Sequence, residues 1–186
     1  MSDRLYSFVG SGSGRWNIVQ LTPVVGEPLP DAACVGVFNG PVAPLPEHSA
    51  WCLRGVTSNE RYVTAAEHAQ LTARQPALDR TEALCAALIP VRKTQAWWDL
   101  AQDDRRAIIE ERSAHIKTGL NYLPAIARRL HHGRDLGEPF DFLTWFEYSP
   151  AHAGTFEELV TRLRSTEEWT YVDREIDIRL VRAAGT

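Results

Sequence analysis

The stretch Asp103–Arg134, DDRRAIIEERSAHIKTGLNYLPAIARRLHHGR, predicts a helix followed by a strand. The two aspartates that open it are good helix N-cap residues, and their charge suits the positive end of a helix. Ile108 and His115 are seven residues apart, so one continuous helix would carry both on the same face. Gly119 is a plausible residue to end this helix, which would be roughly 24 Å long.

The histidine and the strand after it each leave two interpretations open. A single histidine such as His115 on an apolar helix face is more often a hydrogen-bonded core residue than a metal or haem ligand. In the strand predicted over residues 123–130, Arg128 lies between Ile126 and Leu130 on one face. A charge at such a position has to be paired, solvated or set against a ligand anion. A salt-bridged arginine is the ordinary interpretation, and an anion site is the alternative.

Composition narrows the class of protein. The 186 residues are 44% hydrophobic, enough for one domain or two fused small halves. The net charge of −4, without a basic stripe, argues against a nucleic-acid partner. The three cysteines form neither a disulfide framework nor a zinc pattern and suit a reducing compartment. We find no secretory leader and no apolar run of about 20 residues, so we expect a cytoplasmic protein with no membrane partner.

Other segments are predicted from hydrophobic periodicity and turn residues. A Gly-rich hairpin turn at residues 10–14 should join the first two strands. A capping box at residues 57–60 should open a helix that runs to about residue 74. Ser149-Pro150, a cap residue followed by proline, should begin another helix over residues 151–164, with a buried face made by Phe156, Leu159, Val160 and Leu163. The expected strands span residues 5–9, 16–25, 33–38, 51–56, 84–91, 139–148 and 175–181.

This order of strands and helices predicts an α+β fold of two tandem ferredoxin-like halves with mainly antiparallel sheets, of the dimeric α/β-barrel type. The first half, residues 1–100, would be truncated. The second half, residues 101–186, would hold the ligand site, and the two halves would form one compact unit. Fold alone does not give function.

Five long segments carry a resemblance to a known family: LRGVTSNERYV, ALIPVRKTQAWWD, HIKTGLNYLPAIARRL, GEPFDFLTWFEY and TEEWTYVDREIDIRL. The chain resembles the chlorite dismutase family of haem b enzymes, specifically its short lineage, over nearly its whole length. The resemblance implies a chlorite O₂-lyase that converts chlorite, a small anion, to chloride and dioxygen. It also implies a homodimer.

The resemblance further implies roles for individual residues. His115 would be the proximal ligand of the haem iron, and Glu168 would accept a hydrogen bond from it. Arg128 would hold chlorite, and then hypochlorite, on the distal side. Haem contacts are implied for Tyr62, Ile89, Lys93, Trp97 and Trp98, with Tyr62 and Lys93 at the propionates. The distal pocket would include Gln75, Leu123, Thr144 and Phe146.

Two alternatives to this function remain at this stage. One is the related branch that decarboxylates iron coproporphyrin to haem, which resembles this chain but has a glutamine where Arg128 stands. The other is a haem carrier or sensor without enzymatic activity. Iron coproporphyrin with peroxide would test the first, and haem transfer to an apoglobin would test the second.

Overall fold

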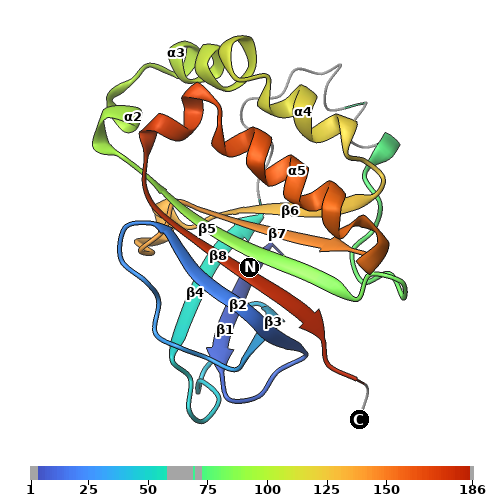
Figure 1. The fold of residues 1–186 in the computed structure, drawn as a ribbon. Helices are drawn as coiled ribbons and strands as arrows, with labels where there is room; N and C mark the ends of the chain where they lie inside the picture. The colour runs from blue at the N-terminus through green and yellow to red at the C-terminus, as the bar shows by residue number, and fades with distance from the viewer. Residues whose placement is uncertain (1–3, 58–68, 70–72, 185–186) are drawn as a thin grey trace.

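The computed structural model describes residues 4–57, 69 and 73–184, and eight of their strands form a closed barrel (Figure 1). The order around the barrel is β1-β3-β2-β8-β5-β7-β6-β4, and each pairing between neighbours is antiparallel. The strands are β1 (Leu5–Ser11), β2 (Trp16–Val25), β3 (Cys34–Asn39), β4 (Trp51–Thr57), β5 (Cys85–Lys93), β6 (Ile126–His132), β7 (Phe142–Tyr148) and β8 (Val172–Arg182).

The predicted mixture of helices with antiparallel strands is confirmed. The division into two ferredoxin-like halves, with a boundary near residue 100, stays a prediction. Of the helix expected over residues 57–74, Tyr62 and most other positions lie outside the described residues.

The barrel consists of a large sheet, β2-β8-β5-β7-β6, and a small sheet, β3-β1-β4. Long runs of paired residues join the strands within each sheet. The two seams between the sheets are much shorter among the described residues. The paired positions there are Trp16–Val35 and Asn17–Cys34 at one seam, and Val56–His132 and Thr57–His131 at the other.

The prediction of a hairpin between β1 and β2 is wrong, because β3 lies between these two strands. The first half of β3 is buried and pairs along its length with β1. The Gly-rich segment therefore carries the chain across the end of β3 instead of making a tight turn. Gly14 passes so close to β3 that an added Cβ would lie 2.9 Å from the carbonyl carbon and oxygen of Val35.

The helices cover one face of the large sheet, and the small sheet lies on its other side (Figure 1). The longest helix among the described residues, α5 (Ala153–Arg164), begins after a proline-led 3₁₀ turn, as Ser149-Pro150 predicts. Its expected apolar face is buried, namely Phe156, Leu159, Val160 and Leu163. Within residues 73–184 the structure also has α2 (Gln95–Asp99), α3 (Gln102–Arg106), the π-helix η1 (Ala107–Arg112), α4 (His115–Asn121) and the 3₁₀ segments η2 (Arg134–Leu136), η3 (Pro150–His152) and η4 (Glu167–Tyr171).

The single helix expected over residues 103–119 is broken into α3, η1 and α4. The break is at Ala114, which has a left-handed φ of 48°. Glu110 provides a hydrogen-bond acceptor at the start of α4, because its Oε2 accepts a hydrogen bond of 2.9 Å from the backbone N–H of Ile116. His115 therefore begins α4, and Gly119 lies inside α4 instead of ending a helix.

Alternation along the strands separates the barrel interior from the face under the helices. Leu143 and Trp145 of β7 point into the interior core, with Ile176 and Ile178 of β8. Phe146 and Tyr148 point the other way and pack against α5. Each fully buried side chain of this size contributes roughly 1.5–3 kcal/mol. Among the described residues, no helix combines the length and apolar character needed to cross a membrane.

Candidate active site

Strand register brings four of the predicted site residues onto the sheet face under the helices. Arg128 of β6 lies opposite Phe146 of β7. Thr144 is two residues before Phe146 and therefore on the same face of β7, where it lies opposite Ile89 of β5. Leu123 was expected in the strand, but it lies in the turn before β6, because α4 continues to residue 121 and a turn fills residues 122–125. From this turn it packs against the apolar cluster of α2, η1 and α4.

The Arg128 side chain reaches from the sheet to helix α4. An added Cβ on Gly119 would lie 2.5 Å from Arg128 Nη1 and 2.9 Å from its Cζ, so the guanidinium lies directly against this glycine. Gly119 is one helical turn after His115, which places both on one side of α4. Gln75 joins the group, because its side-chain amide donates a hydrogen bond to the Arg128 carbonyl.

His115, Glu168 and Lys93 form a hydrogen-bonded chain behind α4. The Nδ1 of His115 is 2.6 Å from Oε2 of Glu168. The Lys93 ammonium donates to Oε1 and to the backbone carbonyl of Glu168, each at 3.0 Å. The side chains of Lys93 and Glu168 are 3% and 8% exposed, whereas His115 is 25% exposed. The carboxylate is thus buried between two nitrogen groups, and the histidine is the most exposed member of the chain.

The electrostatics of this chain favour an ionised Glu168. Burial raises the pKa of Glu168, but the neighbouring His115 and Lys93 outweigh it and lower this pKa to about 2. Burial lowers the pKa of Lys93 from its usual value, and Glu168 opposes that effect. Because the carboxylate remains charged at neutral pH, it accepts a hydrogen bond from the Nδ1–H of His115. The Nε2 of His115 is then the ring nitrogen with an available lone pair.

The two adjacent tryptophans differ in their surroundings. Trp97 is 1% exposed and packs beside Lys93, whose Nζ lies 4.8 Å from the indole centroid. Its buried Nε1 has no hydrogen-bond partner among the described residues. Trp98 is half-buried, and its Nε1 donates to Asp141 at 3.3 Å. The guanidinium of Arg134 covers the Trp98 ring at 4.1 Å from its centroid.

These residues fit a haem. His115 offers one ring nitrogen to an iron, while the other is held by a carboxylate, as in many metal-ligating histidines. Gly119 has no side chain on the same side of α4, so a flat group that approached the helix there would take the place that the Arg128 guanidinium fills. Trp97 Nε1 is a buried donor that needs an acceptor, and a haem propionate is one. Lys93 was expected at a propionate, but its ammonium pairs with Glu168, and a contact with haem stays a prediction.

Three contributors were missed by sequence reasoning. Ser113 accepts a hydrogen bond of 3.1 Å from the Glu168 backbone N–H and so fixes the 3₁₀ turn under His115. Trp169 stacks on the His115 ring, with centroids 6.4 Å apart and an interplanar angle of 19°. Asp141 accepts the Lys93 backbone N–H at 2.7 Å. Only the position of Trp169 directly after Glu168 could have signalled such a role.

Fold and site together define a class: antiparallel barrels that carry a carboxylate-supported histidine on an outer helix. The family model described as chlorite dismutase matches residues 46–183, more than half of the chain. The chain belongs to the chlorite dismutase family. A curated relative, the chlorite dismutase of Ideonella dechloratans, is 33% identical over 86 residues, which is 46% of this chain and 28% of that protein. The match therefore spans less than a third of that relative.

Solved structures extend the similarity to nearly the whole chain. A dimeric chlorite dismutase from Nitrobacter winogradskyi is 56% identical, with a TM-score of 0.89, and the alignment covers 96% of this chain and 99% of that one. A chlorite dismutase variant from Candidatus Nitrospira defluvii is 19% identical, with a TM-score of 0.70, over 98% of this chain and 92% of that one. The second likeness supports the barrel fold.

Proposed function

We propose that the protein is a haem b-dependent chlorite O₂-lyase, which converts chlorite to chloride and dioxygen. Membership of the family and the likeness to the Nitrobacter enzyme support this reaction. The observation that carries it is the hydrogen bond of 2.6 Å between His115 Nδ1 and the buried Glu168 carboxylate. Haem, when bound, would supply the iron at which both chlorine–oxygen bonds of chlorite break and its two oxygen atoms are joined as dioxygen, leaving chloride.

His115 is the proposed iron ligand through Nε2. Glu168 fixes the Nδ1–H tautomer and makes the ring more electron-donating, because a charged acceptor draws the Nδ1 proton toward itself. Lys93 holds Glu168 from the opposite side, so the carboxylate cannot rotate away from the histidine. The three residues thereby set both the direction and the basicity of the nitrogen that faces the iron.

Arg128 is the proposed catalytic residue on the other side of the haem. A guanidinium stays charged at any working pH, and it offers fixed donors to a small anion. One charge-assisted hydrogen bond contributes roughly 1.5–3 kcal/mol. Arg128 would first bind chlorite and then retain hypochlorite until dioxygen has formed. Thr144, Phe146, Ile89 and Leu123 would keep the surrounding wall poor in acids and bases.

Further features of the proposal follow the family. We propose a homodimer, because the similar Nitrobacter protein is described as dimeric. The two ferredoxin-like halves are our interpretation of how the barrel is divided. A cytoplasmic location remains part of the proposal and rests on the sequence expectation.

The test is oxygen evolution from chlorite, followed with an oxygen electrode. Haem-loaded protein should release close to one dioxygen per chlorite, and a haem-free sample should release none. The Arg128→Ala variant, loaded with haem to the same extent, should be much slower. Normal haem loading without oxygen release would refute the proposal, and the iron-coproporphyrin and haem-transfer assays would then identify the alternative.

A further inference from the structure

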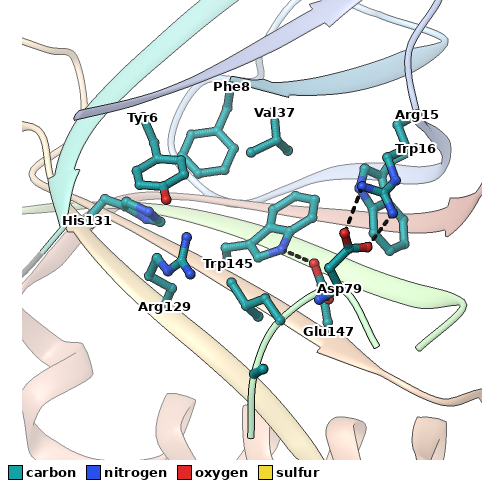
Figure 2. A pocket seen from close by; sticks show the side chains of 12 residues that line it. Tyr6, Phe8, Arg15, Trp16, Val37, Asp79, Arg129, His131, Trp145 and Glu147 are labelled. Carbon is teal, nitrogen blue, oxygen red and sulfur yellow. Dashed lines mark hydrogen bonds and ion pairs between the residues drawn. The ribbon is translucent and has the colours of Figure 1, made fainter. Parts of the chain in front are cut away.

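A cavity of about 390 Å³ lies inside the barrel, on the opposite face of β6 from Arg128 (Figure 2). Its inner wall is aromatic, with Tyr6 and Phe8 from β1 and Trp145 from β7. Arg129 and His131 of β6 lie beside these rings, and the five residues together form what we call the inner end of the cavity. The size is within the range of small-molecule pockets, roughly 300–1,000 Å³. The residues proposed for chlorite conversion do not use this space.

Arg129 is the charged group of the inner end. Its guanidinium carbon lies 5.0 Å from the Tyr6 ring centroid, and Figure 2 shows it directed into the space between Tyr6 and Trp145. In the part of the chain that the structure describes, no carboxylate forms an ion pair with Arg129. A half-buried cation against an aromatic wall is costly without a counter-ion. An anion would therefore be favoured at this position.

His131 adds a second unmet polar group. Its Nδ1 lies 3.1 Å from the Leu143 carbonyl and donates to it, and its Nε2 is buried without a hydrogen-bond partner among the described residues. Burial lowers the pKa of His131 to about 4, so the ring is neutral at physiological pH. His131 thus contributes an unsatisfied acceptor and no charge. Arg129 remains the cation that sets the preference for a ligand.

The acidic residues of the cavity are already occupied. Glu147 accepts the Trp145 Nε1–H at 2.9 Å, and it also accepts the backbone N–H of Asp79 at 2.5 Å. Asp79 pairs with Arg15 at the exposed end of the cavity. Figure 2 shows the Trp145 ring between Arg129 and Glu147. The carboxylates are therefore set apart from the inner end and do not neutralise Arg129.

We propose that this interior cavity binds a small aromatic carboxylate, with its carboxylate on Arg129 and its ring between Tyr6, Phe8 and Trp145. A guanidinium matches a carboxylate with two parallel hydrogen bonds. Aromatic rings stack in offset or edge-on arrangements against such a wall. A halide or another small inorganic anion would leave most of the space unfilled, so the shape favours an organic acid.

Benzoate is a suitable probe, and benzamide is its uncharged counterpart of nearly the same shape. Binding is measured by calorimetry on haem-loaded protein saturated with cyanide, which prevents benzoate from reaching the iron. An unchanged Soret band during the titration verifies this. The Arg129→Gln variant removes the cation. The matched control is Arg162→Gln, because Arg162 lies on the exposed side of α5 and pairs with Glu158.

We expect benzoate to bind the unaltered protein and the Arg162→Gln control equally, and to bind Arg129→Gln at least about tenfold more weakly. Benzamide should also bind at least about tenfold more weakly than benzoate. The Val37→Phe variant, which fills the cavity and keeps Arg129, should lose binding even if Arg129→Gln proves unstable. Equal binding of benzoate and benzamide, equal binding by Val37→Phe, or no benzoate binding up to about 10 mM would overturn the proposal.

Discussion

Replacing Glu168 by glutamine should lower the free energy of unfolding of the haem-free protein by about 3 kcal/mol at pH 7. The pKa of Glu168 is lowered from an ordinary 4.5 to about 2. At about 1.36 kcal/mol per pKa unit, this difference corresponds to about 3 kcal/mol of stabilisation of the charged form. The neutral amide keeps the size of the side chain but leaves the Lys93 ammonium, 3% exposed, without its counter-ion.

The loss should depend on pH in one direction. A carboxyl whose pKa is lowered by folding stabilises the protein fully above its unfolded pKa, here about 4.5. That contribution disappears as the pH falls from about 4.5 toward 2, because the unfolded chain then takes up the proton first. The difference in stability between the unaltered protein and Glu168→Gln should therefore shrink steadily over this interval.

Urea unfolding followed by far-UV circular dichroism measures the difference at pH 7 and at pH 3. The control is Glu158→Gln, since Glu158 is 54% exposed and pairs with Arg162 on the surface of α5. It should change stability by at most about 1 kcal/mol. Adding Lys93→Met to Glu168→Gln should recover part of the loss, because the unpaired ammonium is then gone. A Glu168→Gln cost below about 1 kcal/mol, or one that does not vary with pH, would refute the reasoning.

Four other outcomes are expected. His115→Ala should abolish the Soret shift on haem titration, while circular dichroism stays unchanged; a normal Soret spectrum would exclude His115 as the ligand. Arg128→Ala should bind haem but turn over chlorite roughly 10–100-fold more slowly and release more hypochlorite to a chlorination scavenger; unchanged leakage would count against its role. Gly119→Leu should weaken haem binding without loss of helix, because the new side chain would fill the place beside α4 where the Arg128 guanidinium lies. Phe156→Ala should cost about 3–5 kcal/mol in urea unfolding, because this side chain is 0% exposed.

Local signals predicted much of the fold. The alternation in β7 and β8 gave the strands, and the spacing in α5 identified its four buried residues. These elements are long, and their periodicity agrees with the tertiary environment. The position of β3 between β1 and β2 could not be inferred in the same way, because strand order depends on contacts between distant segments. A Gly-rich stretch between two strands predicts a turn equally well when the chain crosses a third strand.

The break of the helix at Ala114 could not be predicted from the sequence for a different reason. Positive φ is usually signalled by glycine or asparagine, and the segment around Ala114 contains neither. The break is supported instead by the Glu110 carboxylate, although a glutamate at such a position usually lies on a solvated helix face. The ion pair of Lys93 with Glu168 could not be predicted from local sequence either, since 75 residues separate the two partners. Resemblance to a family identified both residues but paired Lys93 with the haem.

The two short seams of the barrel have a consequence for hydrogen exchange. A barrel has no free edge, yet this one is joined between β2 and β3 and between β4 and β6 by few described pairings. The small sheet β3-β1-β4 can therefore separate as a cooperative unit while β5, β7 and β8 remain bonded on both sides. Amide protons of β1 should exchange earlier than those of β5, although both strands are largely buried. The same opening would expose the interior cavity without disturbing the face that carries His115 and Arg128.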